Sequence, residues 1–238
     1  MVKNTLIKAI CAAAFILSVG PAFAEKPVLG VAEFKNTATG VYWWRGGVGW
    51  DLSSMLTNEL ASTNAFTLVE RSKLEPVLAE QDLADYGRVR KGTGAKVGQL
   101  TGAQYLVLGT VTAFEDKVAK TGGGVSFKGI RVGGKKGDAY LAVDLRVVDS
   151  TTGEIAFVRT VEGRASTKGI NLGLYRGGFG GNLAKEEKTP TGKAIRAAVI
   201  EIADYLECAM VTKGGCMAEY DAKESKRRAS GKKSLKLD

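Results

Sequence analysis

Histidine is absent from the 238 residues of this chain, and cysteine and proline are scarce, with three and four residues respectively. Without histidine there is no Ser-His-Asp or Cys-His catalytic set, no histidine-ligated zinc and no imidazole general base. Aspartate and glutamate number 25, but no compact pair of them marks an acid–base site. The 31 glycines follow no period, which excludes a collagen-like chain. We therefore expect no enzymatic activity, no metal site and no cofactor.

A single long apolar run is present, Ala9–Val19, and it lies behind two lysines at the start of the chain. It is short for a membrane span. Pro21 follows it, and Ala22-Phe23-Ala24 has the small residues that a signal peptidase reads. We expect residues 1–24 to be a signal peptide and the mature chain to be exported to the periplasm; an uncleaved anchor is the alternative.

The three cysteines are consistent with export. Cys11 lies in the signal peptide, so the mature chain keeps an even number, Cys208 and Cys216. In an oxidising compartment they can form a disulfide across the segment AMVTKGG and hold the end of a helix. A metal pair is the alternative, but two thiols without histidine supply few ligands.

The formal net charge is +9, and much of it lies in the last segment, KESKRRASGKKSLKLD. This segment has no apolar period, so we expect residues 218–238 to be a disordered basic tail. The tail suits an anionic surface, such as the outer membrane or another part of the envelope, or it is simply a solvated end. An exported chain without a recognition motif is not expected to bind nucleic acid.

Between residues 25 and 217, apolar patterns of strand and helix type alternate. Strands are expected at Pro27–Phe34, Phe66–Val69, Tyr105–Phe114, Ala139–Val148 and Ile155–Val161. Helices are expected from an N-cap at Asp51 to Ser62, and at Ser72–Ala84, Gly94–Ala103 and Gly192–Met210. This order predicts an α/β (α+β) layered domain, in which a mixed β-sheet is flanked by helices.

Two glycine-rich segments do not fit a compact domain, residues 115–138 and 163–191. Structureless loops of this length are uncommon, and both are interpreted as long β-hairpin extensions. In the second, Ile170, Leu172 and Leu174 alternate with other residues, the pattern of a strand with one apolar face.

A third unusual segment, Val41–Leu52, reads VYWWRGGVGWDL and holds all three tryptophans of the chain. Core aromatics usually recur at regular spacing, whereas Tyr42, Trp43 and Trp44 stand in a row beside glycines. The segment is therefore a candidate functional loop.

Four segments in this order resemble the curli secretion channel family, which includes CsgG and HfaB: VAEFKNTATG, FTLVERSKLEPVLAEQDL, QLTGAQYLVLGTVTAFE and AVDLRVVDSTTGEI. The resemblance implies a periplasmic α/β domain that assembles into a homo-oligomeric ring. Each subunit would add two hairpins to one outer-membrane barrel. Physical reasoning agrees, because four strands cannot close a barrel and open edges are not viable in lipid.

The resemblance also implies site residues and partners. The loop between the first strand and the first helix narrows the lumen in this family, which points to Tyr42, Trp43, Trp44 and Arg45 as constriction residues for an unfolded secreted polypeptide. An accessory periplasmic factor is a further partner of such a channel. The alternative for the tryptophans is packing beneath the loop or against a neighbouring subunit.

The membrane-facing hairpin residues that the resemblance indicates are Val125, Phe127, Ile130 and Val132 in the first hairpin, and Ile170, Leu172, Leu174 and Phe179 in the second. By simple alternation, Arg131 shares a face with Val125 and Phe127, and a charge on a lipid face costs ~2–4 kcal/mol near the midplane.

The expected cleavage site has Ala24 and Glu25 where lipoproteins of this family carry a cysteine, so no lipid anchor is expected. The sequence thus favours a subunit of an oligomeric outer-membrane export channel. The alternative is a non-pore periplasmic scaffold of the same fold that serves envelope or surface-structure assembly.

Overall fold

The computed structural model describes residues 25–119, 125–127, 130–132, 136–166, 183 and 189–235 of the chain. The expected signal peptide, residues 1–24, lies outside these described residues, and so do Ile170, Leu172, Leu174 and Phe179 of the second predicted hairpin. The inferences about these segments therefore stay predictions.

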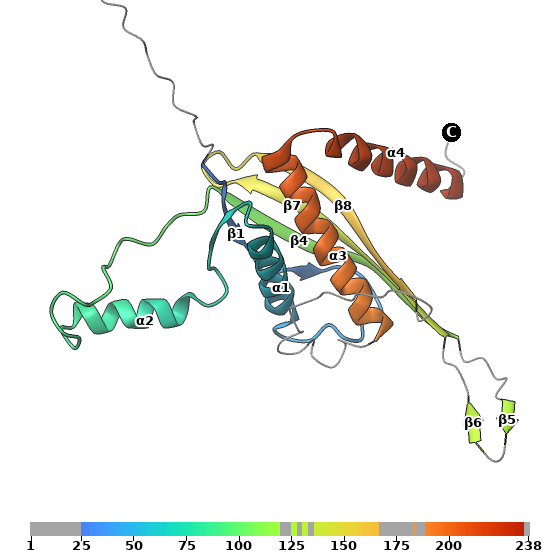
Figure 1. Ribbon diagram of the computed structural model, residues 1–238, viewed down its shortest axis with the longest axis horizontal. Coiled ribbons are helices and arrows are strands. Elements are labelled where there is room, and N and C mark those ends of the chain that lie inside the picture. Colours follow the sequence, from blue (N-terminus) through green and yellow to red (C-terminus); the bar gives the residue numbers. More distant parts are fainter. Residues whose placement is uncertain are drawn as a thin grey trace, which may run out of the picture.

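The centre of the fold is a six-stranded mixed sheet in the order β3-β1-β4-β7-β8, with β2 paired to β4 (Figure 1). β1, β3 and β4 are parallel, whereas β4, β7 and β8 are antiparallel. Parallel neighbours need long crossover connections, and the segments that carry α1 (Val48–Thr63) and α2 (Leu74–Asp85) supply them. The strands are β1 (Val28–Val31), β2 (Lys35–Asn36), β3 (Thr67–Val69), β4 (Tyr105–Ala119), β7 (Lys136–Asp149) and β8 (Ile155–Ser166).

Two helices, α1 (Val48–Thr63) and α3 (Pro190–Glu207), pack against each other and cover one face of this sheet. The predicted apolar stripe of α3 is confirmed, because the four residues at helical spacing are all buried: Ile195, Val199, Ile202 and Leu206. On the opposite face of the sheet Leu108 and Val158 remain exposed. The core therefore lies between α1, α3 and one face of the sheet.

A glycine sets how closely α3 approaches β8. At Gly163 a Cβ atom would collide with the carbonyl oxygen of Ala194 on α3. Any larger residue at this position would separate helix and strand, so the glycine is needed for the packing distance.

The hairpin between β7 and β8 follows the predicted turn DSTTGEI. Asp149 accepts hydrogen bonds at its Oδ1 from the backbone amides of Thr151 (2.8 Å) and Thr152 (3.0 Å). Gly153 has a φ of 75°, a left-handed conformation that suits glycine. The three long strands continue further than predicted, because cross-strand pairing sustains them beyond their apolar residues.

The first helix starts earlier than the N-cap predicted at Asp51. Its N-cap is Gly47, with a φ of 88°, and Asp51 lies in the first turn. A carboxylate is favourable there beside the positive end of the helix dipole, so Asp51 marks the helix start without capping it.

Two further expectations near the surface were wrong. Residues 218–235 of the expected disordered tail belong to helix α4 (Cys216–Leu235). Conversely, residues 94–103 form no helix.

The predicted disulfide is confirmed, since Cys208 and Cys216 are bonded. This bond joins the start of α4 to the end of α3, and a π-helical turn, Cys208–Thr212, lies between the two helices. No helix in the described part of the chain is long and apolar enough to cross a bilayer.

Candidate functional site

The aromatic loop between β2 and α1 is anchored in the core by Trp43. This side chain is only 2% exposed, and its ring packs edge-to-face on Phe114 of β4, with 5.6 Å between centroids. Trp44 is half-buried beside it, 5.8 Å away. Within the described residues Trp43 Nε1 has no hydrogen-bond partner. Trp43 therefore packs beneath the loop, as in the alternative interpretation of the tryptophans, and its buried side chain does not line a lumen in this structure.

Tyr42 fastens the same loop to two other elements. Its hydroxyl lies 3.0 Å from Asp116 Oδ2 on β4 and 3.0 Å from Thr191 Oγ1 at the start of α3. Its ring packs edge-to-face on Phe114, with centroids 5.8 Å apart. We call Tyr42, Trp43, Phe114, Asp116 and Thr191 the clasp, because together they hold the loop against the strand.

The solvent side of the loop is formed by other residues. Tyr42 is 55% exposed despite its hydrogen bonds, and Arg45 is also exposed. Gly47 follows and turns the chain into α1. Of the four predicted constriction residues, the structure thus leaves Tyr42 and Arg45 open to solvent, Trp44 half-buried and Trp43 buried.

The clasp lies where a three-stranded ribbon leaves the domain. β4 pairs with β7 as far as Ala119 and Lys136, and β7 pairs with β8 as far as Asp138 and Ser166. β2 ends opposite Val111. Beyond that point, β7 is the one strand of the described chain that pairs with β4. β8 likewise has β7 as its one strand neighbour there. Within the described residues the two outer edges of the ribbon therefore have no strand partner, and Figure 1 shows the ribbon extending away from α1 and α3.

A short hairpin, β5 (Val125–Phe127) and β6 (Ile130–Val132), belongs to the first glycine-rich segment. Its register pairs Val125 with Val132, Ser126 with Arg131 and Phe127 with Ile130. Cross-strand partners lie on the same face of a ladder. The register therefore groups the four apolar positions on one face and Arg131 with Ser126 on the other. Simple alternation placed Arg131 among the apolar residues, and this was wrong because the hairpin turn resets the alternation.

A family model of the curli production assembly/transport component CsgG matches residues 12–235. The chain belongs to the CsgG family. The curated proteins contain no relative that matches the sequence.

Several solved structures resemble this CsgG-family chain at low sequence identity. CT253, a hypothetical protein from Chlamydia trachomatis, has a TM-score of 0.45 at 16% identity and covers 79% of this chain and 99% of its own. The PelC dodecamer from Paraburkholderia phytofirmans has a TM-score of 0.40 at 13% identity and covers 79% and 91%. Lipoprotein GNA1162 from Neisseria meningitidis has a TM-score of 0.35 at 16% identity and covers 62% and 88%. None of these three reaches a TM-score of 0.5, so the assignment rests on the family model.

One CsgG-family landmark, Val69-Glu70-Arg71, forms a structured turn after β3. The Glu70 carboxylate accepts hydrogen bonds from the amides of Arg71, Ser72 and Lys73 and from the Ser72 hydroxyl, at 2.6–3.1 Å. These bonds, above all the one from the hydroxyl, hold the pKa of Glu70 below its usual value. The turn fixes the direction in which the chain leaves the sheet toward α2 (Leu74–Asp85).

The C-terminal helix α4 encloses a groove of about 730 Å³ with strand β8. Arg159 of β8 lies over the rings of both Tyr205 and Tyr220, at 4.9 and 5.0 Å from their centroids, and donates to the carbonyl oxygen of Tyr220. Burial raises the pKa of Tyr220 to about 12. The groove carries charges of both signs, and the ion pairs Lys223–Glu201 and Arg227–Glu224 satisfy part of them. No cluster of metal ligands is found among the described residues.

The sequence interpretation missed three residues that hold the aromatic loop on β4 and α3 by ring packing and hydrogen bonds: Phe114, Asp116 and Thr191. Phe114 and Asp116 are two residues apart on one strand and so share a face, which is a weak signal of a common partner. Thr191 is distant in the sequence from both, and no local pattern indicates its contact.

Proposed function

We propose that this chain is a subunit of an oligomeric outer-membrane export channel for unfolded polypeptides. The observation that carries the proposal is the ribbon of β4, β7 and β8, whose outer edges have no strand partner within the described residues. Its strands have 15, 14 and 12 residues. A strand that crosses a membrane needs about 9–11 residues. The ribbon beyond Val111 and its register partners Val143 and Val161 is shorter than this, so it would form the base of a span that the glycine-rich segments would complete.

Open strand edges need partners, because an unpaired row of N–H and C=O groups cannot be accommodated in lipid. Identical copies supply complementary edges. β4 and β8 run in the same direction, so the second predicted hairpin would add a fourth strand beside β8, and that strand would meet the free edge of β4 on the next copy in an antiparallel wall. A ring of such contacts closes a barrel, which removes every edge. The amphipathic register of the β5–β6 hairpin suits a wall with one lipid-facing side and one lumen-facing side.

The loop suits a narrowing at the base of this wall. The clasp attaches it to β4 where the ribbon begins, and a rigid attachment is needed for a constriction of defined width. Tyr42, Arg45 and the half-buried Trp44 are the residues that we assign to the lumen, with Trp43 as their anchor. An aromatic and cationic ring would exclude folded protein and disfavour cationic cargo.

The experiment is purification of the mature chain in mild detergent, followed by negative-stain imaging and single-channel recording. Rings that conduct support the channel, and Tyr42→Ala should then raise the conductance. Arg45→Gln is the matched variant for charge, because it should change ion selectivity more than conductance. A monomer that osmotic shock releases from cells would contradict the channel.

The second candidate is a non-pore periplasmic scaffold of the same fold. It is favoured by α4, which carries lysines and arginines at its exposed surface and is held on the body by the disulfide. Such a helix suits attachment to an anionic envelope surface. A scaffold would give soluble complexes without conductance, which separates the two candidates in the same experiment.

A further inference from the structure

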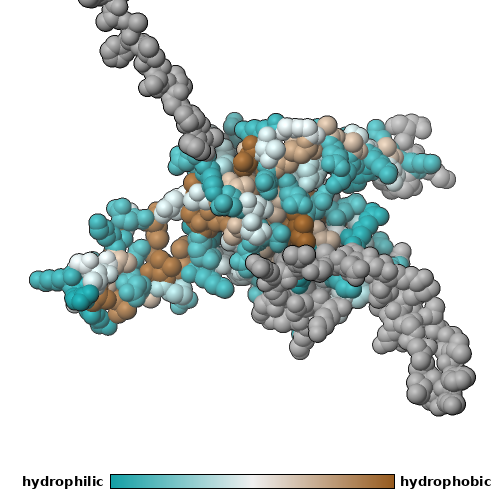
Figure 2. Space-filling model, viewed as in Figure 1, coloured by the Kyte–Doolittle hydropathy of each residue, from teal (hydrophilic) through white to brown (hydrophobic). Residues whose placement is uncertain are grey.

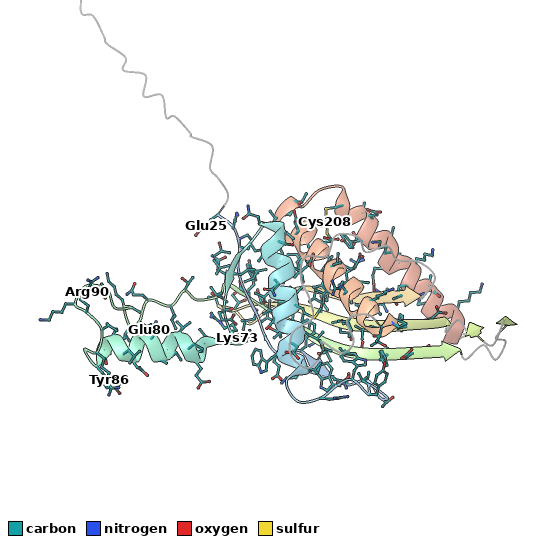
Figure 3. The ribbon with its side chains drawn as sticks, turned by 60° about the horizontal axis from the view of Figure 1, so that its bottom comes forward. Glu25, Lys73, Glu80, Tyr86, Arg90 and Cys208 are labelled. Carbon is teal, nitrogen blue, oxygen red and sulfur yellow. A yellow bond between two sulfur atoms is a disulfide. The ribbon has the colours of Figure 1, made fainter. Side chains whose placement is uncertain are left out.

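Helix α2 and its return segment, residues 72–102, form an arm that stands away from the domain (Figures 1 and 3). Figure 3 places Lys73 at its root, with Glu80, Tyr86 and Arg90 further out. The arm is unusual because its apolar side chains are exposed: Val77 (40%), Leu78 (45%), Leu83 (38%), Tyr86 (72%), Val97 (59%) and Leu100 (47%). Gln81 is the one residue of α2 that is buried.

The arm is nevertheless a built element. Its root is fixed by the Glu70 turn and by Arg71, whose guanidinium donates to the carbonyl oxygen of Thr101 at the other end of the arm (3.4 Å). Its return segment packs on α2 so closely that a Cβ at Gly94 would lie 2.7 Å from the Cβ of Ala84. An ordered element that presents a cluster of apolar side chains to water marks a contact surface, and brown atoms gather on it in Figure 2.

A second uncovered apolar surface lies on the face of the sheet that α1 and α3 leave open. Leu108, Ile155 and Val158 are 36%, 52% and 64% exposed there. The register puts Leu108 opposite Arg146 and Arg146 opposite Val158, so these three form one row across β4, β7 and β8. Leu108 and Arg146 also line a groove of about 590 Å³. We call this surface the open face.

The two surfaces lie at the same end of the sheet. A Cβ at Gly30 would lie 3.2 Å from Arg71 and 3.3 Å from Ala103, at the two ends of the arm, and 3.3 Å from Leu106, two residues before Leu108. The arm extends sideways from one end of the sheet of its own chain (Figures 1 and 3). If two copies stood side by side with their ribbons pointing in the same direction, the arm of one copy and the open face of the other would lie at the same height along the ribbon axis.

Size and charge also match. A helix of 12 residues is about 18 Å long, enough to cross the three strands of the open face, which span about 10 Å. α2 carries carboxylates and no cation between its ends: Glu75, Glu80, Asp82 and Asp85. On the open face Arg146 is exposed, and within the described residues it has no ion-pair partner.

We propose that α2 of one copy docks on the open face of the next copy in the ring. This rests on the proposed function, because it needs a ring, and it names the contact that holds the ring outside the barrel. The contact is heterologous, with different surfaces on the two copies, and repetition of such a contact around an axis closes a ring.

The test uses the full mature chain in mild detergent, with rings counted by negative-stain imaging and by sedimentation. Leu78→Glu and Val158→Glu each put a carboxylate into the contact, and each should lower the oligomer fraction about tenfold or more. Ala79→Glu is the matched control, since it adds the same charge to the next residue of α2 on a different face of the helix. All three positions are exposed in the single chain, so melting temperatures by circular dichroism should match the wild type.

A cross-link identifies the contact directly. The variant with both Leu78→Cys and Val158→Cys should give covalent oligomers larger than dimers under mild oxidation. Either substitution alone offers one new thiol per chain and should stop at dimers.

The outcomes separate the inference from the channel. The docking is overturned if the oligomer fraction of Leu78→Glu or Val158→Glu equals that of Ala79→Glu. It is also overturned if the double-cysteine chain gives only dimers or an internal disulfide. Either result leaves the channel proposal standing. A wild-type chain that forms no ring overturns both.

Discussion

The hydroxyl of Tyr42 donates a hydrogen bond to Asp116 Oδ2 over 3.0 Å, and so ties the aromatic loop to the strand that enters the ribbon. The same oxygen of Asp116 lies 3.4 Å from the hydroxyl of Thr191. Loop, ribbon and α3 therefore meet at one carboxylate.

Replacement of Tyr42 by Phe should lower the free energy of unfolding by about 1 kcal/mol, because the hydroxyl contacts with Asp116 and Thr191 are lost while the ring contact with Phe114 remains. Urea denaturation measures this. Tyr86→Phe is the control, since Tyr86 is 72% exposed and should lose almost nothing. Equal losses in the two variants would mean that the clasp does not hold the loop.

Replacement of Trp43 by Ala should cost about 3–5 kcal/mol, because the side chain is buried against Phe114 and its removal leaves a cavity. Trp50→Ala, at a 37% exposed position on α1, should cost less than half as much. Thermal or urea unfolding of both variants makes the comparison. A Trp43→Ala chain that keeps wild-type stability and conducts more current would instead make Trp43 a lumen residue.

Replacement of Gly163 by Ala should destabilise the domain by about 1–3 kcal/mol, because the added methyl group collides with the backbone of α3 at Ala194. Gly102→Ala is the control, where a Cβ meets nothing within 4 Å. The shift in urea midpoint measures the difference, and similar midpoints for the two variants would contradict the close packing of α3 on β8.

Replacement of Asp204 by Asn should stabilise the protein at pH 7. Burial, reinforced by Glu201, Glu59 and Glu207, raises the pKa of Asp204 above its usual value of 3.8. A carboxylate whose pKa is higher in the folded chain than in the unfolded chain destabilises the fold when ionised, and that cost disappears as the pH falls through the folded pKa.

The melting temperature of Asp204→Asn should therefore exceed that of the wild type at pH 7, and the gap should close in acid. Asp82→Asn, at an exposed position on the arm, is the control for replacing a carboxylate by an amide. A gap that stays constant down to pH 3 would show that the gain does not come from the charge.

Local patterns predicted most of the elements. The apolar spacing of Ile195 and Val199 was sufficient for α3, and the polar turn residues after Asp149 were sufficient for the β7–β8 hairpin. These features depend on neighbours within a few residues, which a sequence displays directly. The boundaries of the elements were less accurate. The start of α1 was predicted at Asp51, but the N-cap is Gly47 in a left-handed conformation, and glycine has no capping side chain that a sequence pattern could indicate.

The predicted loop was found where expected, but the roles of its residues were not deducible. The row of aromatics gives the same signal whether Trp43 faces the lumen or the core, and only the position of Phe114 on β4 decides between them. In the same way, alternation along one strand placed Arg131 wrongly, because faces in a hairpin follow the pairing between strands.

The sequence by itself determined most of the strands and helices, the cysteine pair and the membership of the CsgG family, since these follow from short-range periodicity, composition or ordered motifs. Tertiary structure alone decided that Trp43 is buried, that the basic end is a helix, and that α2 carries its apolar residues into solvent. Burial is a property of contacts between residues far apart in the chain, and the same apolar side chain is either core or contact surface according to what those residues leave uncovered.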